Sequence, residues 1–424
     1  MAKRDYDDEL ISTGRKRKQK KKKIKNDVPQ NGVKVDLRVT EKPRNRYYLA
    51  AAGKYRAARY VTVILLAVFL FVMLLFFREN ITYSNLMYLV RDLDTDNLSS
   101  AGSFAGITYD GQYAEKFALF KGRIAVAGTT GLTLYDSSGS KEAEYDCSYT
   151  NPGLEVSEKY ALMYDAGDKS YSVYTSVARV LSEKSDQIIE AASVSDSGYY
   201  ALLTRSEEAK FLVTVYNGSF KPVTKYYKDK YVIDLALNKT GSEAAIVSAA
   251  ADNSSVYCEV SMCKIGTEET VSLNLDGLMP VSARYADDGS LFVMCDTALL
   301  SFRDGELSWR HDFTGMTPVC FDINKNTAAV TCSENAVGSV NAVLVFDING
   351  NVLYNITLEH KISATVTDGE SAVYAVGDGK ADRIDLSDGS VSSESVSVVP
   401  VKLLAPPGSL IVCGEGGTSS HFTG

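Results

Sequence analysis

Apolar runs of four or five residues recur along most of this chain, and a short polar turn precedes each run. At Asp196-Ser197-Gly198 one run stops, the chain turns on a glycine, and the next run, 199–203, begins. The same event occurs at seven further turns: 120–122, 158–159, 239–241, 287–289, 325–326, 367–369 and 406–408. Measured at residues 122, 159, 198, 241, 289, 326, 369 and 408, successive turns lie 37 to 48 residues apart. A period of about forty residues with short strands is typical of a β-propeller.

A second turn, built on Asp or Asn followed by Gly, recurs within the periods. It occurs at 136–139, 217–218, 304–305, 347–350 and 388–389. Asn-Gly and Asp-Gly favour tight hairpins because both residues tolerate positive φ. The runs after the first turns are almost continuously apolar, as expected of a strand that is covered on both faces. Each period therefore predicts four strands in the order innermost strand, first turn, buried strand, third strand, second turn, outer strand.

Eight first turns predict an all-β, eight-bladed β-propeller, with a seven-bladed ring as the alternative. The eighth period is short, because only residues 409–424 follow Gly408. We expect Val401–Thr423 to supply three strands of this blade and Phe104–Asp110 to supply its outer strand. This closure leaves no open sheet edge between the first and last blades.

Charge divides the chain into a basic arm and an acidic body. Residues 1–59 contain 19 Lys or Arg and 7 Asp or Glu, a net charge of +12, so the remainder carries −20 to give the total of −8. We interpret residues 1–54 as a disordered cytoplasmic arm, because they are rich in charge and poor in large apolar residues. The nearly continuous basic run Arg15–Lys25 is interpreted as a topology determinant. Binding to anionic lipid headgroups is the alternative, and we expect no specific nucleic acid partner.

The run Val61–Phe77 contains seventeen residues without a charge. As a helix it would span about 26 Å, close to the thickness of a bilayer core. Lys54, Arg56 and Arg59 precede the run, and the positive-inside rule places that end in the cytoplasm. No small-residue cleavage site follows, which disfavours a cleaved signal peptide. We predict an uncleaved signal-anchor over residues 55–78 that crosses the cell membrane once and places the body outside the cytoplasm.

Residues 79–103 are expected to join this anchor to the propeller. Within them, Ser84–Leu93 carries Leu86, Leu89 and Leu93 at helical spacing. This spacing indicates a juxtamembrane helix, which acts either as a plain stalk or as an amphipathic docking helix. Asp94–Ser103 is rich in Asp, Asn, Ser and Gly, as is typical of a linker. The propeller then occupies residues 104–424.

Signals for catalysis or cofactor binding are weak. The three histidines, His311, His360 and His421, stand alone in their segments, and His311 is expected on the surface of an outer strand. Motifs of serine hydrolases, zinc proteases and EF-hands are absent from the sequence. Oxygen-rich turns at 287–289 and 347–350 could hold calcium, but hairpin geometry accounts for them. We assign no catalytic, cofactor-binding or metal-binding residue.

Seven cysteines are scattered along the chain, at positions 147, 258, 263, 295, 320, 332 and 413. Cys295 and Cys332 occupy matching positions after their turns and are expected to be small buried apolar residues. A disulfide between Cys258 and Cys263 would need a close approach of their Cα atoms and stays open as an alternative.

Tyrosines cluster in the second and third periods, at positions 164, 171, 174, 226, 227 and 231. Exposed tyrosines would form a face that binds protein or glycan. Tyrosines are also common in strands, where they serve structure alone. The sequence leaves both interpretations open.

The turn-and-strand units 195–203 and 286–294 resemble those of bacterial YVTN- and quinoprotein-like propellers. The order of basic arm, apolar helix, Asn85–Leu93 segment and propeller resembles an uncharacterised family, a domain of unknown function, of membrane-anchored bacterial proteins. The resemblance covers about residues 55–424 and implies a fold and a location but no catalytic residue. Trp309 is the only tryptophan, which argues against a quinone-dependent enzyme, whose propeller motifs repeat tryptophan. Eight-bladed scaffolds of envelope assembly share this architecture, which is an analogy of fold alone.

These patterns together predict a binding or scaffolding module of the cell envelope that works without catalysis or a cofactor. Its partner would be a protein or a glycan. The alternative is an envelope glycan-active enzyme that uses Asp and Glu at the centre of the ring. Clustered carboxylates with shifted pKa values at that place would favour the enzyme.

Overall fold

The computed structural model describes residues 54–55, 58–69, 71, 104–109, 116–252, 255–335 and 337–423. The chain divides into two units, residues 1–79 and 80–424. In the first unit, residues 54–55, 58–69 and 71 are helical. Among the described residues, no helix has both the length and the apolar character that a membrane crossing requires. Nearly all of the predicted arm, the end of the predicted anchor, and the segments 84–93 and 94–103 lie outside the described residues.

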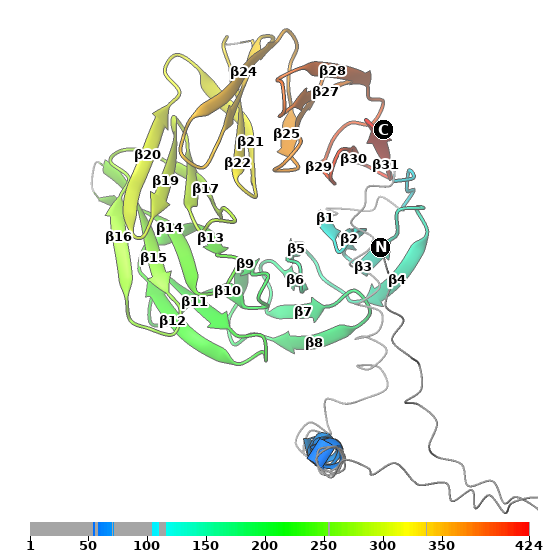
Figure 1. Ribbon diagram of the computed structural model, residues 1–424. Coiled ribbons are helices and arrows are strands. Elements are labelled where there is room, and N and C mark those ends of the chain that lie inside the picture. Colours follow the sequence, from blue (N-terminus) through cyan, green and yellow to red (C-terminus); the bar gives the residue numbers. More distant parts are fainter. Residues whose placement is uncertain are drawn as a thin grey trace, which may run out of the picture. The chain divides into compact units, whose positions relative to one another are not determined.

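The second unit contains eight antiparallel sheets, numbered here as blades 1 to 8, arranged in a ring (Figure 1). Blade 1 consists of β1 (Lys116–Phe120), β2 (Arg123–Gly128), β3 (Gly131–Tyr135) and β4 (Lys141–Asp146), and blade 2 consists of β5 (Pro152–Val156), β6 (Ala161–Asp165), β7 (Ser170–Tyr174) and β8 (Arg179–Lys184). Blade 3 consists of β9 (Ile189–Val194), β10 (Tyr200–Arg205), β11 (Phe211–Tyr216) and β12 (Pro222–Lys228), and blade 4 consists of β13 (Tyr231–Leu237), β14 (Glu243–Asp252), β15 (Ser255–Lys264) and β16 (Thr270–Asn274). Blade 5 consists of β17 (Pro280–Tyr285), β18 (Leu291–Cys295), β19 (Ala298–Arg303) and β20 (Glu306–Asp312), and blade 6 consists of β21 (Thr317–Asn324), β22 (Thr327–Ser333), β23 (Asn341–Phe346) and β24 (Val352–Leu358). Blade 7 consists of β25 (Ala364–Thr367), β26 (Ala372–Gly377), β27 (Lys380–Asp385) and β28 (Val391–Ser395), and blade 8 consists of β29 (Lys402–Leu404), β30 (Leu410–Gly414) and β31 (Gly417–His421).

Each predicted first turn joins the innermost strand of a blade to its second strand. Gly198 has a φ of 89°, which favours glycine. A Cβ there would also lie 2.7 Å from Lys159 Cδ of the preceding blade, so the close approach of the two blades requires glycine as well. Turns of adjacent blades are also hydrogen-bonded to one another. Ser197 N donates to Lys239 O over 3.1 Å. The recurring turn is therefore a structural element that fixes neighbouring blades.

The second strands form the core, because blades on either side cover both of their faces. All five residues of β6, β18 and β30 are buried. Cys295 and Cys332 lie on β18 and β22 with no exposed surface, as predicted. Cys258 and Cys263 lie five residues apart on the single strand β15, which separates them by about 16 Å. Both are free thiols, so the disulfide considered for them is wrong.

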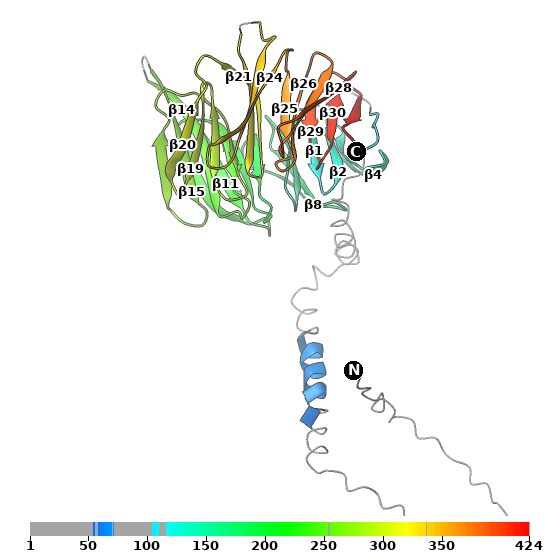
Figure 2. The same cartoon turned by 45° about the horizontal axis from the view of Figure 1, so that its top comes forward.

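The ring closes through residues 104–109 from the amino side of the propeller, an extended segment with one isolated β-bridge that is here called the closing strand. Thr108 pairs with Gly417 of β31 in antiparallel fashion, and Thr418 N donates to Ile107 O over 2.9 Å. Phe104 and Ile107 are buried in a cluster with residues of β2 and β30. The innermost strands β29 and β1 of the last and first blades meet here (Figure 2). The predicted closure is confirmed for residues 104–109, since Asp110 lies outside the described residues. The eight-blade count is confirmed, and the seven-bladed alternative is wrong.

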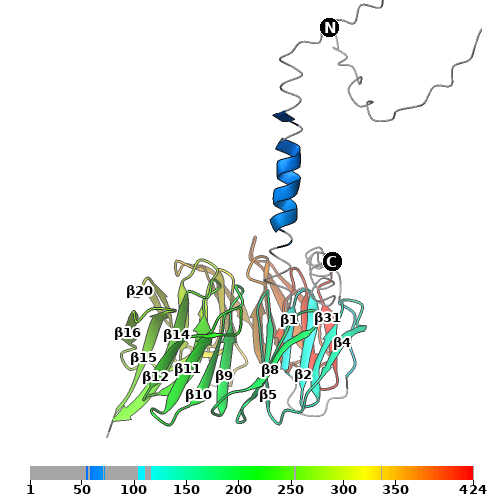
Figure 3. The same cartoon turned by 90° about the horizontal axis from the view of Figure 1, so that it is seen from below.

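The strands run between two faces of the ring, which Figure 3 shows from the side. The first and second turns form one face, here called the turn face. The connections between blades and the hairpins between second and third strands form the other, here called the loop face. Ala105 N donates to Ser137 O in the second turn of blade 1 over 2.9 Å. The closing strand 104–109 therefore begins at the turn face.

Candidate functional site

Five charged side chains on innermost strands act on one another around the axis of the ring. They are Glu155 on β5, Asp234 on β13, Arg284 on β17, Asp322 on β21 and Lys402 on β29. The innermost strands of all blades border the axis (Figure 1), which brings together charges that are far apart in the sequence. Arg284 and Lys402 each interact electrostatically with both Glu155 and Asp322. These five residues are called the central cluster.

Asp234 joins blade 4 to blade 5. Its Oδ2 atom accepts hydrogen bonds from Ser282 Oγ (2.7 Å), Ala283 N (2.9 Å) and Arg284 Nη1 (3.0 Å). Its Oδ1 atom accepts one from Leu235 N at 2.9 Å. Charge-assisted bonds of this kind are strong. Asp234 is therefore engaged in holding two blades together.

Asp322 makes a similar link between blades 6 and 7. Its Oδ2 atom accepts a hydrogen bond from Thr367 N over 2.9 Å, and Asn324 Nδ2 donates to Thr367 O over 3.0 Å. Burial raises the pKa of Asp322, although the bond from Thr367 and the charge of Lys402 act in the opposite direction. The carboxylate is thus a structural acceptor in an enclosed place.

Among the described residues, no hydrogen bond holds the side chain of Glu155 or that of Lys402, and Glu155 is the one carboxyl group of the cluster in this position. Burial raises its pKa from 4.5 to about 7, and the positive charge of Arg284 only partly offsets this. A carboxyl group with this pKa gains or loses its proton near neutral pH, as a general acid or base does.

Exposed apolar side chains gather on the loop face. At the loop-face ends of four innermost strands, Ile233, Val281, Val319 and Val401 are 38%, 52%, 49% and 57% exposed. Further exposed apolar residues lie on the same face, in the adjoining connections, hairpins and strand ends: Tyr231, Val256, Tyr257, Met279, Val337 and Val399. We call these ten residues the loop-face apolar set. Contiguous exposed apolar surface is typical of binding sites, whereas single exposed apolar side chains are normal.

The turn face is polar and internally bonded. Lys239 Nζ lies 3.7 Å from Glu158, 3.6 Å from Asp196 and 3.5 Å from Asp287, and so links the turns of four blades. In the described part of the propeller, no exposed large apolar side chain lies in a first or second turn; those outside the loop face lie on outer strands. The two faces therefore differ in chemistry.

His311 is half-buried instead of lying on the surface as expected. Its ring packs against Phe313 and Phe346, with centroids 5.3 and 4.8 Å away. Burial lowers the pKa of His311. Phe346 belongs to the next blade, and the sequence alone does not show that it covers this position. His360 Nε2 lies 2.9 Å from Oδ2 of the buried Asp382.

His421 joins two residues that the sequence keeps apart. Its Nε2 atom is 2.9 Å from Ser419 Oγ, and its Nδ1 atom is 3.2 Å from Glu394 Oε2. The order serine, histidine and carboxylate is that of a hydrolase triad. Ser419 and His421 lie on β31 and Glu394 on β28, so the same bonds also join blade 8 to blade 7.

The oxygen-rich turns are explained by their own hydrogen bonds. Asp347 Oδ1 accepts from Asn349 N (2.8 Å) and Asn351 N (2.9 Å), and Asp288 Oδ1 accepts from Ser290 N (3.0 Å). These bonds shape the hairpins. Among the described residues, no group of three His, Cys, Asp or Glu is placed to hold a metal ion.

The clustered tyrosines divide into two kinds. Tyr164, Tyr171 and Tyr174 are buried between blades, as expected if these tyrosines serve structure alone. Tyr227 and Tyr231 are 48% and 60% exposed. The tyrosine cluster is thus partly core and partly surface.

Sequence reasoning missed the central cluster. One signal for it was available, namely acidic residues inside otherwise apolar strands, such as Asp234 in 231–237 and Asp322 in 317–324. The basic partners gave no such signal, because Arg284 and Lys402 lie near the ends of their segments.

The geometry can be compared with known proteins. A model of a family of unknown function, DUF5711, matches residues 105–394. No curated protein matches the sequence significantly. Among solved structures, BamB from Moraxella catarrhalis is similar at 14% identity and a TM-score of 0.50, with 75% of this chain and 96% of that chain covered. Sqt1 from Saccharomyces cerevisiae is similar at 11% identity and a TM-score of 0.53, with 76% and 98% covered. These likenesses show the β-propeller fold alone.

Proposed function

The chain belongs to the family of unknown function DUF5711, and we propose that it is a binding or scaffolding module of the cell envelope that holds a protein partner on its loop face. The supporting observation is the loop-face apolar set. Side chains such as Val281, Val319 and Val401 stay exposed where the loop face surrounds the axis. The turn face directs its polar groups to one another, which leaves the loop face as the surface with unsatisfied apolar area.

We also propose that the propeller is extracytoplasmic and is anchored by Val61–Phe77. The support is the sequence: an uncharged run with Lys54, Arg56 and Arg59 before it. The closing strand begins at the turn face, so the chain enters the propeller on the face opposite the loop-face apolar set. Protease added to intact protoplasts should remove the propeller and spare the arm, and protection of the propeller would contradict the topology.

Capture of the partner from membranes tests the binding role. The double variant V281D/V319D places two charges on the loop face. The matched control V352D/L353D places two charges on β24, at side chains that are 41% and 47% exposed on the outer rim. After cross-linking, a reproducible protein should co-purify with the wild type and the rim control and be lost with the loop-face variant. Equal recovery with all three proteins would contradict the proposal.

An enzyme is the second candidate function, and two observations favour it. Glu155 has a pKa raised to about 7 by burial, and Ser419, His421 and Glu394 are bonded in the order of a triad. A fluorophosphonate probe labels a serine that is activated by histidine. Labelling that is lost in S419A would favour a hydrolase. Conversion of an envelope glycan that is lost in E155Q would favour the glycan-active alternative.

A further inference from the structure

Aromatic side chains fill the outer crevice between blades at two neighbouring junctions. Between blades 5 and 6, Trp309 of β20 lies over Gly350, where a Cβ would be 2.6 Å from its ring, and its Nε1 donates to Ile348 O over 2.9 Å. Between blades 6 and 7, Tyr354 of β24 lies over Gly389 at the same distance, and its hydroxyl donates to Leu386 O over 3.1 Å. Each ring thus belongs to an outer strand and bonds the second turn of the next blade.

The junction between blades 4 and 5 has a valine at this place. Val271 of β16 lies over Gly305 in the second turn of blade 5, where a Cβ would be 3.2 Å from its Cγ2 atom. Valine is smaller than either aromatic ring and has no side-chain hydrogen-bond donor. The outer crevice at this junction is therefore less filled than at the next two.

Phe302 lies at the floor of this crevice and is 3% exposed. Phe302 and Phe346 occupy equivalent places on the third strands of blades 5 and 6, since each pairs directly after the register shift with its outer strand. Trp309 stacks on Phe346, with centroids 6.2 Å apart and planes 17° apart. In the described residues, no aromatic ring pairs with Phe302.

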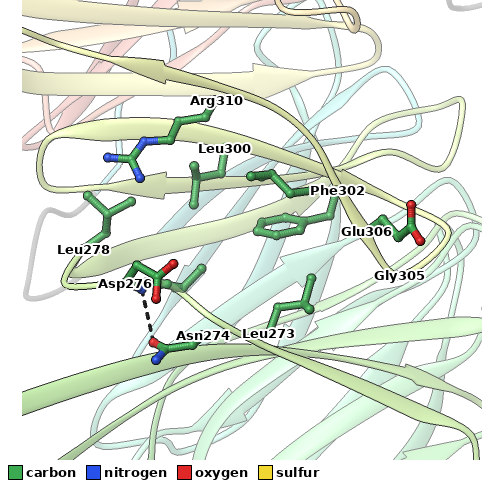
Figure 4. Close-up of a pocket in the computed structure, with 11 residues that line it drawn as sticks. Leu273, Asn274, Asp276, Leu278, Leu300, Phe302, Gly305, Glu306 and Arg310 are labelled. Carbon is green, nitrogen blue, oxygen red and sulfur yellow. Dashed lines mark hydrogen bonds between the residues drawn. The ribbon is translucent and has the colours of Figure 1, made fainter.

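A cavity of about 450 Å³ lies beside Phe302, between β16 and β20. Figure 4 shows Leu273 and Leu300 on opposite sides of the Phe302 ring, with Arg310 and Asp276 toward one end and Glu306 at the other. The volume falls within the range of about 300–1,000 Å³ that is usual for ligand sites. The walls are apolar and the ends are polar, as an amphipathic side chain requires.

We propose that this cavity binds the tryptophan or tyrosine side chain of an extended segment of a partner protein, in which the residues next to the aromatic one are basic. The ring would lie between Leu273 and Leu307, above the buried side chain of Phe302. This site opens on the outer rim and reaches the loop face at the connection 275–279, and its binding of a ring is tested independently of the function proposed for that face. It gives the propeller a second point of attachment.

The charges at the cavity specify the neighbours of the aromatic residue. Asp276 and Glu306 line it, and the guanidinium of Arg310 is held by Asp312, with Nε and Nη2 at 2.8 and 2.7 Å from Oδ1. Three acids and one base give these four residues a formal charge of −2. Lysine or arginine beside the inserted ring complements this charge.

N-acetyl-5-fluorotryptophanamide, titrated into the full-length chain and followed by fluorine NMR, tests the cavity. The variant V271W supplies the missing ring from the chain itself, and L307W covers the cavity from β20, where Leu307 is 51% exposed. The control V352W adds the same ring on the rim of blade 6. We expect saturable broadening with the wild type and V352W, and affinity reduced by roughly tenfold or more in whichever of V271W and L307W folds. Absence of saturable binding to the wild type, or equal binding by all variants, would overturn the proposal.

Two peptides test the partner class. Acetyl-Lys-Trp-Lys-amide should bind several-fold more tightly than acetyl-Glu-Trp-Glu-amide at low salt, and the difference should shrink as salt screens the charges. Equal binding of the two peptides would overturn the basic neighbours. Binding of the fluorinated amide with no binding of either peptide would overturn a protein segment in favour of a free aromatic molecule.

Discussion

Thr108 pairs with Gly417, so one blade is built from the two ends of the propeller sequence. Ile107 is 2% exposed and packs with Ile411 of β30 in the core of that junction. This is the blade that links the first and last parts of the propeller sequence, so it makes the ring continuous. Stability of the whole ring should therefore depend on contacts at its two ends.

Deletion of residues 411–424 should unfold the propeller as a whole instead of trimming its end. The milder variant I107A should reduce the free energy of unfolding by about 2–4 kcal/mol, as expected for loss of a buried isoleucine side chain. Fluorescence of Trp309, in blade 5, reports unfolding at a distance from the closure. The control V391A changes a side chain that is 42% exposed and should have little effect. A truncated chain that melts like the intact one would contradict the closure.

Gly350→Ala should destabilise the propeller more than Gly408→Ala does. Both glycines have positive φ, 81° and 76°. A Cβ at Gly350 would lie 2.6 Å from the Trp309 ring, whereas a Cβ at Gly408 would meet nothing within 4 Å. We expect about 1 kcal/mol of backbone strain in both variants and a further 1–3 kcal/mol from the overpacked ring in Gly350→Ala. Chemical denaturation measures the difference, and equal losses would show that the ring moves aside freely.

Glu155 should make stability depend on pH near neutrality. Its folded-state pKa is raised to about 7 from 4.5, so the folded chain binds more protons than the unfolded chain between these two values. Stability contributed by the protonated group is present below pH 4.5 and is lost as pH rises through 7. E155Q keeps a neutral side chain, so its free energy of unfolding should rise relative to that of the wild type over this window. The expected rise is on the order of 1 kcal/mol, because the Glu155 side chain is only half-buried. Denaturation of both proteins at pH 5 and pH 8 measures the gain, and a constant difference would contradict a raised pKa.

The blade count and the closure could be predicted from sequence because both depend on local signals. Turns such as Asp196-Ser197-Gly198 require glycine at positive φ, and the buried strands after them lose alternation on both faces. The incomplete eighth period and the spare strand at Phe104–Asp110 then favour eight blades over the seven-bladed alternative. These features are properties of short segments, and the sequence displays them directly.

The sites could not be predicted because they depend on relations between blades. Glu155 and Arg284 interact only because both innermost strands border the axis, and nothing near either residue indicates the other. Similarly, Val271 is recognised as part of a site only when the structure shows that it occupies the place that Trp309 occupies at another junction. The exposure expected for His311 is wrong for the same reason, since Phe346 comes from the next blade.

The central claim is that the loop face binds a protein partner. A photo-crosslinking amino acid at Val319, which is 49% exposed on the loop face, tests it in intact cells. The same amino acid at Val352, which is 41% exposed on the outer rim of the same blade, is the matched control. A discrete adduct from the Val319 position, with none from the Val352 position, is the predicted result. No adduct from Val319, or the same adduct from both positions, would contradict the account.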